Sequence, residues 1–544
     1  MEEALLGIVT TINNYLSNYI LIILLLGMGI WFTVRTKAIQ FRCFGEGWRR
    51  VFGNFSLRGG NQGGGMTSFQ ALSTAIAAQV GTGNIVGACG AIIVGGPGAI
   101  FWMWIIALLG MATNYAEAVM AQKTRVVDED GTVHGGPVYY ITTAFKGNGG
   151  KFLAGFFAVA IILALGFMGC MVQSNSIAET MNTAFGIPTW VMGLIVVILA
   201  GTVFIGGVSR LAAVTEKIVP IMAVLYVLGS LVVLIMNAAN IPATFALIFQ
   251  CAFNPDATVG GATFGIIAAI SQGAKRGLFS NEAGMGSTPH AHALAEVKDP
   301  HEQGVVAMIG VFVDTIIVVT MTALVVLSVL YVGDGTLATG DYATLTAETI
   351  TKTNIAQLAF GQFFGANVGA WFVAICLLFF AFSTILSWNL FAKLNVEWLF
   401  GKKAVLPFTI IALAFIFMGS LLSNDLVWEL ADMFNQLMVI PNAIALFALS
   451  GAVLAIANAK HDKRALDAAE ERLEDQERAA INAMVEEDKR NGAPITNKIY
   501  HRAAFGPPSG WRPRYGQTQV GRTCQNAGFS IGESSCWNSA GFSD

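Results

Sequence analysis

Charged residues are scarce in this sequence. Asp, Glu, Lys and Arg make up only 12% of its 544 residues, and the net charge at neutral pH is −3. The basic residues are scattered among the connections between apolar segments, so the charge pattern gives no indication of a nucleic-acid partner.

Paired cysteines and catalytic motifs are lacking as well. The apolar spans contain no Gly-x-Ser-x-Gly elbow and no His-Glu-x-x-His motif. No catalytic apparatus is visible, so we expect neither enzymatic activity nor a cofactor. Single cysteines stand in or beside apolar segments without the paired spacing of a metal site, and we interpret them as small packing residues: Cys43, Cys89, Cys170, Cys251 and Cys376.

Long apolar blocks dominate what is present. Hydrophobic residues make up 55% of the chain, and they come in blocks near twenty residues long rather than in amphipathic stripes. The start, Met1-Glu2-Glu3, lacks the positive charge of a signal peptide, so we expect the first block to remain as a membrane anchor. The sequence therefore predicts an all-α polytopic membrane protein with eleven spans, at about 15–36, 67–95, 97–122, 152–175, 188–207, 209–237, 262–286, 304–332, 366–393, 404–422 and 425–457.

Loop charge predicts the orientation of these spans. The first connection holds six basic residues between Arg35 and Arg58, and the third holds four between Lys123 and Lys151. The alternate connections hold no Lys or Arg, except for Lys352. By the positive-inside rule, the N-terminus lies outside and the C-terminus lies in the cytoplasm.

Three further segments have a distinct character. The outer connections at 243–249 and 355–360 are too apolar for free loops, and we expect short helices there that lie at the outer surface and cover an entrance. Residues 459–490 are densely and alternately charged, which is typical of a solvated cytosolic helix. Residues 491–544 are rich in Gly, Ser and Pro and are predicted to be disordered.

Two of the spans are interrupted. The stretch Val80-Gly81-Thr82-Gly83-Asn84 breaks an apolar helix that otherwise runs over 67–95, and a similar break is expected at 277–284. A backbone group freed within hydrocarbon costs several kcal/mol unless protein, water or a ligand takes up its hydrogen bond. A break at that depth therefore indicates a binding function.

The position of the two breaks predicts an internal repeat. Setting the first span aside leaves ten spans, and each set of five opens with an interrupted helix whose break falls fourteen residues along it, at Gly81 and at Gly277. Because five is odd, the two sets have opposite orientations, which is typical of an inverted repeat with its substrate site near the midplane. The predicted organisation is an extra span and cytosolic loop at 1–62, repeats at 63–261 and 262–458, then the charged helix and the tail.

The ends of a broken helix favour a zwitterion together with a cation. Unpaired amides and a positive dipole end suit a carboxylate, and we assign this role to Thr82 and Gly83. Free carbonyls at the end of the first half-helix suit Na⁺, and we assign this role to Ala77, Gln79 and Val80.

Two motifs carry a resemblance to a known family. QVGTGNI at the first break, and RGLFSNEAGMGS followed by PHAHA at the second, resemble the alanine or glycine:cation symporters of the amino-acid–polyamine–cation superfamily, which have a LeuT-type fold. The likeness covers about 15–457. It implies sodium-coupled symport of small neutral amino acids into the cell, across a bacterial or archaeal cytoplasmic (inner) membrane.

The resemblance also implies site residues. The substrate pocket would include Gln173, Phe279, Ser280, Asn281, Trp371 and Ile375. Crowding of the side-chain space by Phe279, Trp371 and Ile375 would admit a hydrogen or a methyl group and penalise anything larger. The common sodium site of the fold would use Ala381, Ser383 and Thr384.

Asp314 is a candidate cation ligand from the residues themselves. It lies some ten residues into its span, about 15 Å along the helix and close to the bilayer centre. A carboxylate there is functional by default, and we predict that it binds the cation with Asn84 and Ser280. A pairing of Asp314 with a basic residue is the alternative, and Lys275 and Arg276 either line an outer vestibule or pair with an acid.

Several functional alternatives stay open at this point. Asp314 can exchange a proton as readily as hold Na⁺, so proton-coupled transport is the second reading. An ion channel fits less well, because a selectivity filter is usually repeated around an axis by oligomerisation. Alanine and glycine, the D and L enantiomers, and the oligomeric state are left open.

Overall fold

The computed structural model describes residues 2–53, 66–129, 132–254, 257–259 and 261–459. The charged helix and the tail predicted after 459 lie outside the described residues.

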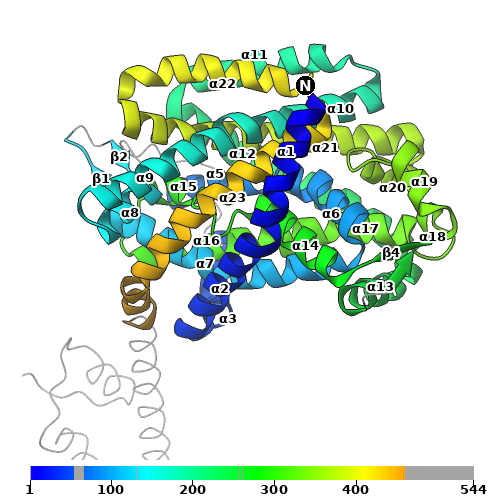
Figure 1. The fold of residues 1–544 in the computed structure, drawn as a ribbon, viewed down its shortest axis with the longest axis horizontal. Helices are drawn as coiled ribbons and strands as arrows, with labels where there is room; N and C mark the ends of the chain where they lie inside the picture. Colours follow the sequence, from blue (N-terminus) through cyan, green and yellow to red (C-terminus); the bar gives the residue numbers. More distant parts are fainter. Residues whose placement is uncertain (1, 54–65, 130–131, 255–256, 260, 460–544) are drawn as a thin grey trace, which may run out of the picture. The chain divides into compact units, whose positions relative to one another are not determined.

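The described residues are mostly helical, as the apolar blocks predict (Figure 1). The first half of the chain contains α1 (Glu2–Tyr15), α2 (Ile22–Arg35), α3 (Ile39–Arg42), α4 (Phe44–Phe52), α5 (Ser68–Gln79), α6 (Ala88–Gly95), α7 (Gly98–Thr124), α8 (Pro137–Ala144), α9 (Gly147–Ile161), α10 (Cys170–Phe185), α11 (Thr189–Ile205), α12 (Gly207–Met236) and α13 (Ile241–Phe253). The second half contains α14 (Ile266–Asn281), α15 (Pro289–Ala293), α16 (Pro300–Val311), α17 (Thr320–Leu330), α18 (Thr336–Thr339), α19 (Tyr342–Glu348), α20 (Ile355–Phe364), α21 (Ala366–Phe400), α22 (Val405–Gly419) and α23 (Asn424–Ala448).

Short helical turns and two β-hairpins complete the described part. π-helical segments are η1 (Leu16–Leu21), η2 (Gly83–Gly87), η3 (Ile162–Gly169) and η5 (Phe312–Val319), and 3-10 turns are η4 (Ala238–Asn240) and η6 (Lys402–Ala404). The antiparallel hairpins pair β1 (Val126–Val127) with β2 (Val133–His134) and β3 (Ala257–Val259) with β4 (Ala262–Phe264). In the second hairpin Thr258 is opposite Thr263.

By length and composition, the described residues contain fewer candidate membrane spans than the eleven predicted. Eight described helices are long and apolar enough, and the bent pair formed by Ser68–Gln79 and Gly83–Gly95 brings the number to nine. Two predicted spans fall short. Thr189–Ile205 has 17 residues, and α14 ends after 16 residues at the second break.

The first break lies where the sequence predicts it. A capping box starts α5, because the Thr67 side chain accepts from the backbone of Gln70 and the Gln70 side chain accepts from the backbone of Thr67. The helix ends at Gln79, and Val80 leaves the helical conformation with φ −80° and ψ 87°. The chain becomes helical again at Gly83, and the two halves are bent by 45°.

The second break begins later than predicted. The helix α14 continues through Gly277 to Asn281, and Glu282 ends it with φ +58°. The irregular segment runs from there to α15, which begins at Pro289. The sequence LFSN is compatible with a helix, so the prediction of a break at 277, at the same depth as the first, was wrong. The half-helices before the two breaks have 12 and 16 residues.

The two broken helices lie at the centre of the membrane part. The helix α14 packs against α6 and α7, and α5 packs against α12 and α21, while α7 also packs on α16 and α10 on α21. The first helix, α1 to α2, runs beside α23 (Figure 1). Asn13 donates to both the carbonyl and the carboxylate of Glu429, and Ser17 donates to Gln436 at 3.1 Å.

Helices are present at 243–249 and 355–360, where the sequence predicts short helices at the outer surface. They belong to α13 and α20. The helix α20 packs against α21, and α13 packs against α7.

Candidate functional site

At the first break, side-chain oxygens rather than backbone carbonyls accept the hydrogen bonds of two backbone amides, those of Gly81 and Thr82. The carboxamide oxygen of Asn84 accepts from the amide of Gly81 at 2.9 Å. The amide and the hydroxyl of Thr82 both donate to Oε1 of Gln173, at 3.0 and 2.5 Å. In the described part of the chain, Nε2 of Gln173 is buried without a hydrogen-bond partner. One oxygen atom therefore accepts from the Thr82 amide, which is one of the two amides that we predicted for a carboxylate, and from the Thr82 hydroxyl, which we did not predict.

The glycines of the break allow two close approaches. A Cβ on Gly81 would lie 2.3 Å from the hydroxyl of Thr384, and a Cβ on Gly83 would lie 3.0 Å from Cα of Ser280. Any side chain at these positions would push apart the segments that meet there. Gly83 thus brings the first break directly against the end of α14.

Asp314 lies where the two broken helices meet. Its Oδ1 accepts from the Asn84 side chain at 2.5 Å. Its Oδ2 accepts from the hydroxyls of Ser280 at 2.8 Å and Thr315 at 2.7 Å. All four residues are buried. Among the described residues Asp314 forms no salt bridge, so the structure brings together Asn84, Ser280 and Asp314 as predicted, without a basic partner.

The contacts of Asn84 differ from those expected of a cation ligand. It turns its nitrogen toward Asp314 and its oxygen toward the break. The predicted ligand role through the Asn84 oxygen is therefore absent in this arrangement, because that oxygen already accepts from Gly81.

A second link joins the two breaks. The Gln79 side chain donates to the carbonyl of Asn281 at 2.7 Å, and Asn281 in turn donates to Thr315 at 3.2 Å. The Asn281 oxygen accepts from the amide of Ala283 at 3.0 Å. Gln79 and Asn281 thus hold the ends of α5 and α14 together, and Val80 follows as a buried residue of the break.

The helix α21 contacts the first break through one hydroxyl. Thr384 donates to the carbonyl of Ala77 at 2.8 Å and to Phe380 of its own helix at 3.0 Å. Ser383 is directed elsewhere, since its hydroxyl donates to Phe380 and lies 3.5 Å from the Met222 sulfur. Ala381 is buried on the same helix. Of the predicted sodium group on α21, Thr384 is therefore the side chain that reaches Ala77.

Aromatic rings from two other helices surround Phe279. Its ring lies 4.6 Å from that of Trp428 and 5.6 Å from that of Trp388, between centroids. In the described part of the chain the indole N–H of buried Trp428 has no partner. Trp388 donates to Glu282 at 2.5 Å. Phe279 therefore packs against two tryptophans that the sequence analysis did not select.

Trp371 and Ile375 do not belong to this group. They are 42% and 39% exposed, on the outer face of α21. Trp371 donates to the carbonyl of Ala184 at 2.9 Å and stacks on Phe185 at the end of α10. The resemblance assigned both residues to the pocket, and the sequence of α21, which is apolar on all sides, does not itself show which face is directed inward.

Ion pairs lie over Phe279. Arg276 binds Asp432 through two bonds of 3.1 and 2.9 Å, and Lys275 lies 3.2 Å from the same carboxylate. The guanidinium also lies 4.5 Å from the ring centre of Trp428. Lys275 and Arg276 therefore pair with an acid. A cavity of about 10 Å³ under this pair, lined by residues including Phe279, has room for about one water molecule.

Two buried glutamates hold the second break. Glu117 of α7 accepts from the amides of Gly284 at 2.9 Å and Gly286 at 2.8 Å, and from the Asn442 side chain at 2.7 Å. Glu282 accepts from Trp388 and Ser287. The sequence alone does not connect Glu117 to the break, since its partners lie 167 and 169 positions away.

Known proteins similar to this chain are transporters. The family model described as the sodium:alanine symporter family matches residues 2–474. An uncharacterized transporter of Haemophilus influenzae is 40% identical over 450 residues, which cover 82% of this chain and 94% of that protein. The sodium/alanine symporter AgcS of Methanococcus maripaludis is 39% identical over 459 residues, covering 84% and 98%. The amino-acid carrier protein AlsT of Bacillus subtilis is 36% identical over 475 residues, covering 86% and 95%.

These matches agree with the geometry of the site. The paired breaks, the buried carboxylate between them and the many membrane-crossing helices are features of a transporter. The match extends over nearly all of the described residues. The chain belongs to the sodium:alanine symporter family.

Proposed function

We propose that the protein couples the uptake of small neutral amino acids, alanine or glycine, to the entry of Na⁺ by alternating access. We further propose that ten of eleven spans form a 5+5 inverted repeat of LeuT type, with discontinuous helices at α5–α6 and α14–α15. The protein would lie in a bacterial or archaeal cytoplasmic membrane with its C-terminus inside, as the loop charges indicate.

One observation carries the substrate assignment. The amide and hydroxyl of Thr82 converge on a single oxygen atom of Gln173, and the remaining Nε2 of Gln173 lacks a partner among the described residues. A substrate carboxylate fits this donor set. It would replace the Gln173 oxygen on Thr82 and accept from the freed carboxamide N–H, with Gly83 allowing close approach.

The cation assignment rests on oxygen atoms at the junction. Asp314 supplies a carboxylate, and Ser280 and Thr315 supply hydroxyls within hydrogen-bond distance of it. Oxygen ligands of this kind suit a hard cation such as Na⁺. Replacement of the hydrogen bonds of Asp314 by the ion would keep the carboxylate ionised in a buried place. The carbonyl of Ala77 with Thr384 offers a second position, on the other side of the break.

The aromatic wall supports a small side chain. Phe279 lies beside Gly83 and packs on Trp388 and Trp428. The cavity beside Phe279 has room for about one water and for no amino acid of any size, so Lys275 and Asp432, which line it, would have to separate before a substrate could enter from this side. The present arrangement therefore corresponds to a state closed on this side.

Proton coupling is the second candidate, because Asp314 has no basic partner among the described residues and a proton could replace the cation. Uptake of labelled alanine into proteoliposomes under separately imposed Na⁺ and H⁺ gradients separates the two. We expect uptake with the Na⁺ gradient alone. Uptake driven by a pH gradient without Na⁺ would refute the sodium assignment.

Asp314→Asn gives the matched variant for that experiment. The amide keeps the size of the side chain but cannot neutralise a cation, so we expect Na⁺-driven uptake to fall by roughly 100-fold or more, equivalent to about 2.7 kcal/mol. Asp341→Asn, on the exposed outer segment, is the control and should keep wild-type uptake. Full Na⁺ dependence in Asp314→Asn would contradict the proposed role.

A further inference from the structure

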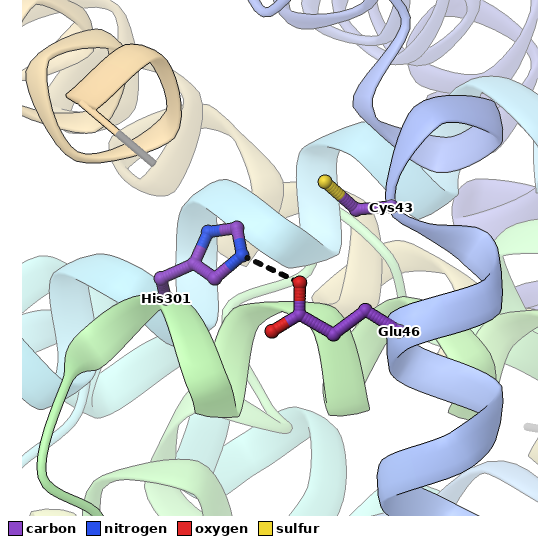
Figure 2. A group of neighbouring side chains, drawn as sticks. All are labelled: Cys43, Glu46 and His301. Carbon is purple, nitrogen blue, oxygen red and sulfur yellow. Dashed lines mark hydrogen bonds and ion pairs between the residues drawn. The ribbon is translucent and has the colours of Figure 1, made fainter. Parts of the chain in front are cut away.

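A compact group of metal-binding side chains lies away from the proposed substrate site. Cys43 connects α3 to α4, Glu46 lies in the first turn of α4, and His301 lies in the first turn of α16 (Figure 2). One ligand atom from each of the three lies within 4.8 Å of the other two. His301 and Cys43 are buried, and the Glu46 side chain is only 7% exposed.

The surroundings orient the imidazole toward the other two residues. Nδ1 of His301 is hydrogen-bonded to the hydroxyl of Tyr115 at 2.8 Å. Nε2 faces Glu46 at 3.4 Å. A metal-binding histidine is commonly held in this way, with its second nitrogen bonded to another group. Cys43 directly precedes α4 and Glu46 follows three residues later in its first turn, so the start of one helix supplies both ligands.

The local charge favours a cation. Three carboxylates lie in or beside the group, Glu46, Asp299 and Glu302, against the guanidiniums of Arg42 and Arg50. Arg50 binds one oxygen of Glu46 at 3.1 Å and also Glu302 at 3.2 Å, which leaves the second Glu46 oxygen directed at His301. A divalent ion would compensate both the excess carboxylate charge and a Cys43 thiolate.

We propose that Cys43, Glu46 and His301 form a Zn²⁺ site that joins α4 to α16. A thiolate, an imidazole and a carboxylate are the donors that Zn²⁺ takes in proteins, and three protein ligands leave the fourth position to water. Zn²⁺ bonds of ~2.0–2.3 Å place donors roughly 3.3–3.8 Å apart, so the ion would draw the three side chains closer together and replace the His301–Glu46 hydrogen bond.

Occupancy would restrain the helix that carries the cation ligand. Below the group, α4 packs tightly on α16, since a Cβ on Gly47 would lie 2.5 Å from the carbonyl of Val305. The helix α16 continues through η5, where Asp314 lies. A metal bond between α4 and α16 therefore fixes the first half of that helix, and Zn²⁺ inhibits transport. This last step rests on the proposed function, whereas the binding itself does not.

Zinc binding to the purified full chain tests the site directly. The protein is prepared without a polyhistidine tag and with Cys524→Ser and Cys536→Ser, so that tail thiols do not contribute. Competition with a chromophoric zinc chelator should show about one tight site per chain. Cys43→Ser and His301→Gln should each weaken it by roughly tenfold or more. Cys376→Ser, which changes a buried cysteine on α21, should leave it unchanged.

Equal zinc affinity in the wild type, Cys43→Ser and His301→Gln would overturn the site. Alanine uptake with Zn²⁺ trapped inside proteoliposomes then tests the consequence, and we expect inhibition that Cys43→Ser relieves. Tight binding without inhibition would refute the restraint of α16. If no amino acid is transported under any condition, the proposed function fails while the chelator measurement still decides the metal site.

Discussion

The two helix breaks are satisfied by groups of different charge. At the first break, neutral carboxamides of Gln173 and Asn84 take up the amides of Thr82 and Gly81. At the second, the carboxylate of Glu117 takes up the amides of Gly284 and Gly286. A neutral acceptor is easily exchanged for a charged ligand, whereas a buried carboxylate bound by three donors is not. We therefore propose that the first break binds ligand and that the second is a fixed anchor.

The largest effect is expected from Glu117→Ala. This change leaves two backbone amides and the Asn442 side chain without their buried acceptor, at about 1–3 kcal/mol each. Thermal unfolding in detergent should show a loss of at least about 3 kcal/mol, and uptake should disappear. Gln173→Ala, the matched variant at the first break, leaves two donors of Thr82 rather than three donors without their acceptor and should destabilise less. Equal losses of unfolding free energy in the two variants would contradict the proposed distinction between the two breaks.

A smaller effect on stability, but a clear one on transport, is expected from Gln173→Glu. The new carboxylate would bind the amide and hydroxyl of Thr82 within the protein and compete with that of the substrate. We expect alanine uptake to fall by roughly tenfold or more, while unfolding stays near that of the wild type. Initial rates over a range of alanine concentrations measure this. A wild-type KM in Gln173→Glu would show that the carboxylate binds elsewhere.

The smallest effect is expected from Trp371→Ala. Its ring lies on the outer face of α21 and is exposed, whereas the rings around Phe279 are buried. Competition of leucine with labelled alanine should therefore remain as in the wild type. Phe279→Ala, which opens the space beside Gly83, should instead let leucine compete. Altered selectivity in Trp371→Ala would show that Trp371 lines the substrate pocket.

The sequence predicted the features that depend on local chemistry. The break at 80–84 follows from two glycines and an asparagine within an apolar helix, and the structure places it there. Asp314 was found because a carboxylate deep in a span is exceptional. Its meeting with Asn84 and Ser280 followed from the paired breaks and is present.

The features that depend on distant partners could not be predicted in the same way. The start of the second break is set by Glu282 and by amides bound to Glu117 from another helix, and nothing in LFSN shows it. The pairing of Arg276 with Asp432 joins residues 156 positions apart. The inward face of α21 is likewise decided by packing, so Trp388 was missed and Trp371 chosen in its place.

The π-helical segment that contains Asp314 has a mechanical consequence. A π turn accommodates one residue more than an α turn, and such turns are frequent at functional sites. One residue of an α-helix corresponds to a rotation of about 100° and a rise of about 1.5 Å. Transfer of the extra residue from one turn to the next thus swings the Asp314 carboxylate around the helix axis without unwinding either end. The π-helical segment thus gives the helix a point of rotation at Asp314, which contacts both breaks through Asn84 and Ser280.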